Sequence, residues 1–368
     1  MAGYTEDEKY MQRCIDLAIQ GKGLVAPNPM VGALLVNNHA IVGEGFHQAF
    51  GEAHAEANAI NNVTSPDLLK KAVLYVNLEP CSHQGKTPPC ANLIISMGIP
   101  KIVIGTPDPN KLVDGSGIAL LREKGINVVT GILENECKAL NKRFFTWHLY
   151  NRPYIILKWA RSADGFIDFD RPADAPVGPN WITSQTARIL VHKWRSEEQA
   201  ILVGTNTVIK DNPRLNIRDW AGKNPLRVII DRELKLGSHY NVFDNTQKTL
   251  VFTQKEPAGS GPGPREFPEK TVVPETGNTE RSYASIVFDD TAELQMLECL
   301  YRQNIQSIII EGGAYTLNRF IEKGLWDEAR IFTGPVLFRR GIRSPEITGN
   351  SFTTREIGNS QLQVIYNR

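Results

Sequence analysis

Residues 51–90 read GEAHAEANAINNVTSPDLLKKAVLYVNLEPCSHQGKTPPC. The segment His54 to Asn62 has helical apolar spacing, and the apolar run Val73 to Leu78 predicts a buried strand. A second predicted helix, from about Cys90 to Gly98, leads into a predicted strand at Lys101 to Ile104. Short apolar strands that alternate with helices predict an α/β sheet covered on both faces.

The rest of the first 150 residues continues this alternation. Thr5 and Glu8 form a capping-box pattern, which predicts a helix that ends at Gly21. Further strands are expected at residues 31–36 and 127–130, and further helices at residues 117–124 and 133–144.

Asn151-Arg152-Pro153 is a predicted domain junction, because a new apolar strand starts directly behind it. We therefore expect two domains, residues 1–150 and 151–368, and the absence of an internal repeat predicts that their folds differ. The Pro-, Gly- and charge-rich residues 256–279 predict a surface excursion. The elements expected in the second domain are strands at 154–159, 200–203, 227–231, 249–252, 285–288 and 307–310, and helices at 184–194, 291–303 and 315–323.

The composition is that of an ordinary soluble globular protein. Of 368 residues, 41% are hydrophobic and 22% charged, and the net charge of +1 gives no field to hold a polyanion. No apolar run reaches the roughly 18 residues of a membrane span, and the acidic N-terminus lacks a signal-peptide core. Five scattered cysteines favour a reducing compartment. We expect a cytoplasmic protein without nucleic-acid or membrane partners.

His54, Cys81 and Cys90 supply the imidazole and two thiolates of a catalytic zinc site, whose fourth position stays open for water. Zinc lowers the pKa of that water, and Glu56 can move a proton without ligating the metal. Both cysteines are expected to begin a helix, where amide dipoles favour a thiolate. Singly, these residues are more often an unreactive pair or core cysteines. Together, with Pro80 before the first cysteine, they favour a zinc-dependent deaminase.

Eight residues separate Cys81 from Cys90, whereas nucleobase deaminases commonly have two. The stretch Leu78 to Cys90 resembles the deaminase domain of the bifunctional riboflavin biosynthesis deaminase-reductases. Pro27-Asn28-Pro29-x-Val31-Gly32 and Gly43-x-Gly45-x-His47 match the same family. The resemblance implies zinc ligation by His54, Cys81 and Cys90, proton transfer by Glu56, and a substrate pocket lined by Asn28, His47, His83 and Lys86. For His47 and His83, an ordinary hydrogen-bonded loop histidine is an equally good interpretation.

The second half carries an ordered set of weaker motifs. Lys158 to Gly165 ends a strand in a turn, Trp181 to Ser184 precedes a helix, and Glu311-Gly312-Gly313 separates a strand from a helix. Glycines of this kind let the backbone approach a ligand and expose helix N–H groups to phosphate. The G-x-G-x-x-G fingerprint is absent from the sequence, which disfavours a Rossmann dehydrogenase.

From about Pro153 to Gly341 this set resembles the reductase domain of the same family, whose fold is similar to dihydrofolate reductase. The resemblance implies an N-terminal cytidine-deaminase-like three-layer α/β/α domain followed by a dihydrofolate-reductase-like α/β domain. It implies NADPH contacts at Arg161, Trp181, Thr207, Asp211, Gly313, Ala314, Tyr315, Thr316 and Leu317. It implies a phosphoribosyl substrate surrounded by Ser184, Arg188, Arg195, Leu215, Arg218 and Glu311. Lys158 would lie beside the reacting sugar, and Lys158 and Asp211 are the candidate catalytic residues.

The chain departs from the family in three places. Ala163 replaces the usual Leu, Gln199 stands where an acid is common, and an insertion covers about Phe169 to Pro179. The insertion lies near the expected nicotinamide entrance and puts individual cofactor contacts there in question.

The resemblance implies zinc-dependent hydrolytic deamination of a phosphoribosyl-diaminopyrimidine, with one zinc ion in the deaminase domain. NADPH-dependent reduction of the ribose to a ribityl chain follows, and a homodimer forms through the reductase domain. Two alternatives remain open at this point: a nucleic-acid or nucleoside base deaminase, and a non-catalytic zinc protein with a ligand-sensing C-terminal domain. The open fourth zinc position and the intact Glu56 disfavour the second.

Overall fold

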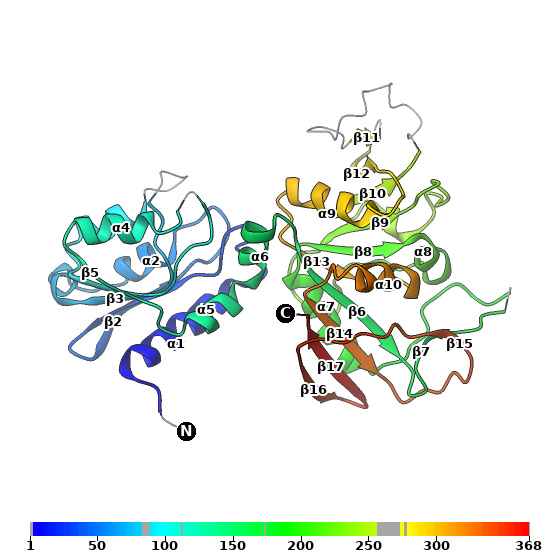
Figure 1. Ribbon diagram of the computed structural model, residues 1–368, viewed down its shortest axis with the longest axis horizontal. Helices are drawn as coiled ribbons and strands as arrows, with labels where there is room; N and C mark the ends of the chain where they lie inside the picture. Colours follow the sequence, from blue (N-terminus) through cyan, green and yellow to red (C-terminus); the bar gives the residue numbers. More distant parts are fainter. Residues whose placement is uncertain are drawn as a thin grey trace. The chain divides into compact units, whose positions relative to one another are not determined.

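The computed structural model describes residues 3–82, 89–111, 113–172, 174–255, 273–275 and 278–367. The chain divides into two compact units, Met1–Asn151 and Arg152–Arg368, each with its own sheet (Figure 1). Among the described helices, none combines the length and the hydrophobicity that crossing a membrane requires.

The first unit is a mixed sheet between two layers of helices. Its strand order is β2-β1-β3-β4-β5, in which β1 is antiparallel to both neighbours and the other pairs are parallel. The strands are β1 (Gly32–Asn37), β2 (Ala40–Phe46), β3 (Val73–Leu78), β4 (Lys101–Thr106) and β5 (Asn127–Thr130). The helices are α1 (Glu6–Ala18), α2 (Ala55–Asn61), α3 (Cys90–Ser96), α4 (Ser116–Glu123), α5 (Glu134–Leu140) and α6 (Lys142–Tyr150), with short 3-10 turns η1 (Ile19–Gly21) and η2 (Pro66–Lys71).

The alternation of side chains along β1 explains the two layers. Leu35 packs in a core that includes residues of α2, α3 and α4, whereas Leu34 packs in a core that includes residues of α1 and α5. Successive side chains of a strand point to opposite faces, so an all-apolar strand needs cover on both. The predicted three-layer α/β/α arrangement is confirmed.

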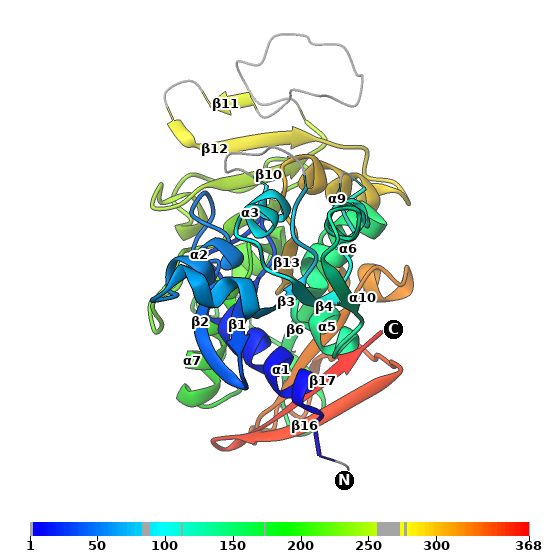
Figure 2. The same cartoon turned by 90° about the vertical axis from the view of Figure 1, so that its left-hand side faces the viewer.

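The second unit is built on a longer sheet, whose described strands run β11-β12-β10-β9-β8-β13-β6-β14-β17-β16. In Figure 2, β12 in yellow and β16 in red lie near the opposite ends of this sheet. The strands are β6 (Tyr154–Arg161), β8 (Ala200–Gly204), β9 (Leu226–Ile230), β10 (Thr249–Thr253), β11 (Val273–Glu275), β12 (Asn278–Ser285), β13 (Ser307–Ile310), β14 (Glu328–Thr333), β16 (Ser351–Ile357) and β17 (Ser360–Tyr366). A separate pair joins β7 (Phe166–Phe169) to β15 (Gly341–Arg343).

Helices cover both faces of this sheet as well. The helices α9 (Ala292–Arg302) and α10 (Ala314–Glu322) contribute to the largest core. The opposite face is covered by α7 (Gln185–Glu197) and, further along the sheet, by α8 (Thr205–Asp211) and the 3-10 turn η3 (Asn241–Phe243). The parallel central strands β9, β8, β13 and β6 lie between these layers, which is why β8 and β13 are almost entirely apolar.

Several element predictions were wrong. The helix expected at residues 133–144 is two helices, because the backbone breaks at Asn141, whose side chain bonds Met30 instead. Cys81 does not begin a helix: residues 79–82 are irregular, whereas Cys90 does begin α3. The strand expected at 285–288 lies earlier, at Asn278–Ser285, so part of the predicted surface excursion at 256–279 is strand. Residues 256–272 of that segment lie outside the described part of the chain.

The strands β2, β7 and β14 to β17 and the helix α8 were not predicted from the sequence. In β2, Gly43 and Gly45 interrupt the apolar alternation that predicts a strand, and the structure explains why glycine occupies these positions. A Cβ at Gly43 or Gly45 would approach the backbone of Ala59 in α2 to 2.5 Å, so glycine lets helix and strand pack closely.

Candidate active sites

In the first unit, His54, Cys81 and Cys90 come together from three separate segments. His54 is the N-cap of α2, Cys81 follows β3 after a short irregular stretch, and Cys90 begins α3. Nδ1 of His54 lies 3.6 Å from Sγ of Cys81 and 3.3 Å from Sγ of Cys90. The three ligand atoms lie within 4.8 Å of one another, which suits a tetrahedral zinc with bonds of about 2.0–2.3 Å.

The surroundings favour thiolate at Cys81. The hydrogen bond with Cys90, aided by the His54 ring and the Cys90 backbone N–H, holds the pKa of Cys81 well below its usual range. The pKa of Cys90 is raised, because its thiol hydrogen-bonds Cys81 and is buried. Cys81 does not begin a helix, but the first N–H of α3, that of Cys90, donates to the Cys81 sulfur at 3.4 Å and stabilises its thiolate.

Glu56 lies in the first turn of α2, and 3% of its surface is exposed. Its carboxyl lies against the Cys90 thiol, and burial raises its pKa above the ordinary range. Glu56 is therefore adjacent to the cluster formed by His54, Cys81 and Cys90, on the helix that His54 caps.

His47 and Asn28 lie next to the same cluster. The His47 ring packs edge-on against His54 with centroids 5.5 Å apart. Its Nδ1 donates to the carbonyl of Ala53 at 3.0 Å, so its Nε2 is the acceptor for the Asn28 amide at 3.0 Å. Burial lowers the pKa of His47, which keeps this ring neutral. The other two predicted pocket residues, His83 and Lys86, lie outside the described residues.

Two buried asparagines that sequence analysis missed hold the loop that carries Asn28. Asn141 accepts from Met30 N–H at 2.8 Å and donates to Met30 carbonyl at 2.8 Å. Asn77 in β3 donates to the same carbonyl and accepts from Gly32 N–H. An asparagine in an otherwise apolar strand, as at position 77, was the available signal, because a buried amide needs partners.

In the second unit, a cavity of about 1220 Å³ opens beside β6, β8 and β13. This volume exceeds the range of about 300–1,000 Å³ typical of small-molecule sites and can hold a dinucleotide together with a substrate. Most of the predicted reductase residues line it: Lys158, Trp181, Arg195, Thr207, Asp211, Leu215, Arg218, Glu311, Gly313, Ala314, Tyr315 and Thr316.

Four predicted residues lie elsewhere. Ser184 caps α7 and accepts from the N–H of Ala187. Arg188 does not line the cavity and instead pairs with Asp219, 2.8 Å away. Arg161 donates to Thr333, and Leu317 is fully buried in the core beneath α10.

Lys158, Arg195 and Glu311 form a buried group of charges on the cavity wall. Arg195 holds Glu311 through two bonds, of 2.7 and 3.2 Å, and Nζ of Lys158 lies 3.7 Å from the same carboxylate. Burial disfavours the charged carboxylate, but the charges of Arg195 and Lys158 outweigh it and lower the pKa of Glu311 to about 2. Burial lowers the pKa of Lys158, and Glu311 partly opposes that shift.

The glycine motif after β13 forms a cradle under α10. A Cβ at Gly312 would meet Thr316 at 2.7 Å, and one at Gly204 would come within 3.0 Å of Thr316 Oγ1. Gly313 is the N-cap of α10, so the first amides of this helix face the cavity. Glycine backbone at a helix N-terminus suits a phosphate group, and these residues fit the dinucleotide NADPH.

The insertion between β7 and α7 is fastened to the cavity wall by Arg171. Its guanidinium donates to Asp168, to Asp211 at 2.6 Å, and to the carbonyls of Gly178 and Lys210. The insertion therefore holds Asp211, a predicted cofactor contact, through a residue that sequence analysis did not single out.

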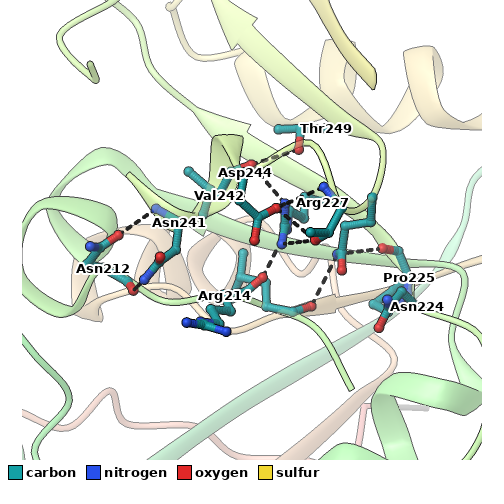
Figure 3. A network of polar contacts seen from close by, with 12 residues as sticks. Asn212, Arg214, Asn224, Pro225, Arg227, Asn241, Val242, Asp244 and Thr249 are labelled. Carbon is teal, nitrogen blue, oxygen red and sulfur yellow. Dashed lines mark hydrogen bonds and ion pairs between the residues drawn. The ribbon is translucent and has the colours of Figure 1, made fainter. Parts of the chain in front are cut away.

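The loop between α8 and β9, residues 212–218, carries Leu215 and Arg218 along the cavity. A network of side chains fixes this loop from behind, centred on Arg227 of β9 (Figure 3). Arg227 is fully buried, pairs with Asp244 at 2.7 Å and donates to the carbonyl of Arg214 at 2.9 Å.

Comparison with known proteins places both sites in one family. Residues 4–106 match the family described as cytidine and deoxycytidylate deaminase zinc-binding region, and residues 153–355 match the RibD C-terminal domain. The riboflavin biosynthesis protein RibD of Bacillus amyloliquefaciens is 40% identical over 349 residues, covering 94% of this chain and 89% of the relative. RibD of Escherichia coli is 33% identical over 355 residues, covering 92% and 90%.

Two solved structures are similar to this chain over nearly its whole length. The diaminohydroxyphosphoribosylaminopyrimidine deaminase/5-amino-6-(5-phosphoribosylamino)uracil reductase of Thermotoga maritima is 35% identical, with a TM-score of 0.82 and 99% of each chain covered. Acinetobacter baumannii RibD is 30% identical, with a TM-score of 0.83 and the same coverage. These matches confirm the predicted cytidine-deaminase-like and reductase folds. They also confirm the predicted cofactors, zinc and NADPH. With a His/Cys/Cys cluster in one unit and a reductase cavity in the other, the chain belongs to the RibD family of bifunctional riboflavin biosynthesis enzymes, which join a zinc-dependent deaminase to an NADPH-dependent reductase.

Proposed function

We propose that the first unit deaminates 2,5-diamino-6-(5-phosphoribosylamino)pyrimidin-4-one and that the second reduces the ribose of the product, 5-amino-6-(5-phosphoribosylamino)uracil. The observation that carries this proposal is the His54, Cys81 and Cys90 cluster with Glu56 beside it, in one chain with the reductase cavity. Both named compounds carry a phosphoribosyl group, which suits the arginines that line that cavity.

In the deaminase site, His54, Cys81 and Cys90 hold the zinc ion. Zinc bound there supplies an activated water for attack on the ring carbon that bears the amine. The Glu56 carboxyl, which lies against Cys90, carries a proton to the departing amine. Asn28 is held against His47, so its amide is oriented to hydrogen-bond the pyrimidine. His83 and Lys86 are proposed to complete the pocket, with Lys86 on the substrate phosphate.

In the reductase site, NADPH supplies the hydride, and the residues position sugar and cofactor. Lys158 lies beside Glu311 in the cavity, where its ammonium group can donate to the oxygen that gains a proton as the sugar ring opens. Arg218 and Leu215 line the substrate side. Thr207, Asp211 and the Gly313 to Thr316 turn line the cofactor side. Since Ser184, Arg188, Arg161 and Leu317 lie off the cavity wall, we give them supporting roles around it.

We also propose that the chain works in the cytoplasm as a homodimer formed through the reductase domain. The family resemblance supports this, and β16, with Phe352 67% exposed, is an edge strand open to pairing. Sedimentation of the full chain at micromolar concentration tests it, and a monomer there would contradict it.

The test of function is NADPH oxidation by zinc-loaded protein given only the diaminopyrimidine phosphate. Oxidation should proceed in the wild type and should fall by roughly 10²–10⁴-fold in Glu56→Gln, because general acid–base catalysis contributes about that factor. Supplying the deaminated compound should restore oxidation in Glu56→Gln. A wild type that oxidises no NADPH with either compound would refute the assignment of the second unit.

A further inference from the structure

The loop at residues 212–218, which carries Leu215 and Arg218, has an unusual backbone. All seven residues are described, and none lies in a helix or a strand. Asn212 has φ of 42° and Leu215 has φ of 54°, in the left-handed region that non-glycine residues rarely occupy. Such a conformation persists only where the surrounding structure fixes it. The geometry of this loop therefore depends on what holds it.

Side chains from outside the loop hold its backbone. They come from α7, β9 and the segments that flank β9, and they replace the backbone pairing that a helix or strand would supply. The bonds are Asn241 with Asn212, Arg227 with the Arg214 carbonyl, Gln247 with the Leu215 carbonyl, Arg195 with the Asn216 carbonyl, Asn224 with the Ile217 N–H, and His192 with the Arg218 N–H.

Among these, Arg227 is the charged residue with no exposed surface. A buried charge is costly unless it is paired and hydrogen-bonded. Its Nη1 pairs with Asp244 at 2.7 Å and bonds the Val242 carbonyl at 3.2 Å, while Nη2 approaches Thr246 at 3.4 Å. These contacts satisfy the charge and leave Nε aimed at the Arg214 carbonyl, 2.9 Å away (Figure 3).

The position of that carbonyl matters because Arg214 directly precedes the left-handed residue Leu215. Fixing the peptide between them fixes one side of the turn, and Gln247 fixes the carbonyl on the other side, at 3.4 Å. Leu215 and Arg218 both line the cavity, so a displaced turn moves them relative to the rest of the cavity wall.

We propose that Arg227 is a positioning residue for the reductase substrate: its guanidinium, neutralised by Asp244, sets the Leu215 turn and with it the approach of Arg218 to the phosphoribosyl group. This inference rests on the proposed reductase function of the second unit. The role requires a planar fork, since a lysine is a single point charge that can pair with Asp244 without reaching the Arg214 carbonyl.

The test uses the full chain and the deaminated substrate, with Arg227→Lys and Arg227→Met. Arg227→Lys should keep the pairing with Asp244 and therefore lower the melting temperature less than Arg227→Met does. It should nevertheless raise KM for the substrate about tenfold, with kcat much less affected. Arg227→Met should raise KM at least as much and also lower the melting temperature, because Asp244 loses its partner.

The matched control is Leu300→Ala, a cavity-forming change in the core beside α9 that does not line the site. It should lower the melting temperature while KM stays at the wild-type value, which separates lost stability from lost positioning. Deamination by the same polypeptide should be unchanged in all three variants.

Wild-type KM in Arg227→Lys and Arg227→Met, with active wild-type protein, would overturn the positioning role alone. The same holds if Leu300→Ala raises KM as much as they do. A wild type that oxidises no NADPH with the deaminated substrate would overturn the reductase assignment and the positioning role together.

Discussion

The ammonium nitrogen of Lys158 lies 3.7 Å from Oε2 of Glu311, and both side chains are more than four-fifths buried. Burial lowers the pKa of Lys158, Glu311 opposes that change, and Arg195 adds to it. The same contacts lower the pKa of Glu311 to about 2, against the opposing effect of burial. These contacts keep Glu311 a carboxylate at neutral pH, and its negative charge favours the protonated form of Lys158.

Glu311→Gln should shift the basic limb of the pH profile of reductase kcat/KM to lower pH. The substitution removes the negative charge that raises the pKa of Lys158, so the ammonium loses its proton earlier as pH rises. The measurement is NADPH oxidation with the deaminated substrate over the whole pH range in which the protein stays folded. Glu322→Gln, at an exposed site on α10, is the control and should leave the limb in place. An unmoved limb in Glu311→Gln would show that Lys158 does not set it.

Glu311 also predicts a stability change in acid. Its folded pKa of about 2 lies below the ordinary value of about 4.3, so it stabilises the fold above the unfolded pKa. That contribution is lost as pH falls from about 4.3 through about 2. The free energy of unfolding of the second unit should therefore change less with pH in this window in Glu311→Gln than in the wild type. Denaturant unfolding followed by tryptophan fluorescence at several pH values measures this free energy. Equal slopes against pH in the two proteins would contradict the ion pairing.

Zinc content should be one ion per chain and should fall to near zero in Cys90→Ser or His54→Ala. Each change removes one of three ligands that lie within 4.8 Å of one another. Cys299→Ser is the matched control, since Cys299 is a free cysteine in the second unit. Metal analysis after dialysis, read together with deaminase activity, gives the result. Full zinc retention in Cys90→Ser would remove Cys90 from the ligand set.

Asn141→Ala should destabilise the first unit by about 1–3 kcal/mol and raise KM for the deaminase substrate. The Met30 N–H loses its acceptor in a buried setting, and the loop that carries Asn28 loosens. Denaturant unfolding and deamination kinetics measure the two effects. Asn61→Ala, at an exposed position of α2, should change the free energy of unfolding by less than about 0.5 kcal/mol. A similar small change in Asn141→Ala would contradict the buried contact.

Arg171→Met should raise KM for NADPH about tenfold, since Arg171 holds Asp211 and closes the insertion onto α8. The dissociation constant measured by NADPH fluorescence should rise with it. The control is Arg340→Met, which removes an 85% exposed arginine 3.8 Å from Asp170 of the same insertion. Unchanged NADPH affinity in Arg171→Met would show that the insertion does not order the cofactor site.

The alternation of buried strands and helices in both units could be predicted from local sequence patterns, because apolar periodicity and capping depend on neighbouring residues. Thr5 with Glu8 predicted the start of α1, and the run Val73–Leu78 predicted β3. The zinc-binding cluster could also be predicted from the sequence, since one histidine and two cysteines in this combination are typical zinc ligands.

The residues that support those sites from far away in the chain became visible only in the folded protein. The helix α5 ends before Asn141, whose side chain hydrogen-bonds the backbone of Met30, 111 residues away. The sequence around Asn141 does not predict that bond. Arg227 and Arg171 have the sequence context of ordinary charged residues in a strand and an insertion. Yet Arg227 is fully buried and bonds the loop at residues 212–218, and Arg171, with 11% of its side chain exposed, bonds Asp211 of α8. The physical reason is that a side chain's hydrogen-bond partners are set by packing across the fold, whereas its own sequence neighbourhood sets only backbone preference and burial pattern.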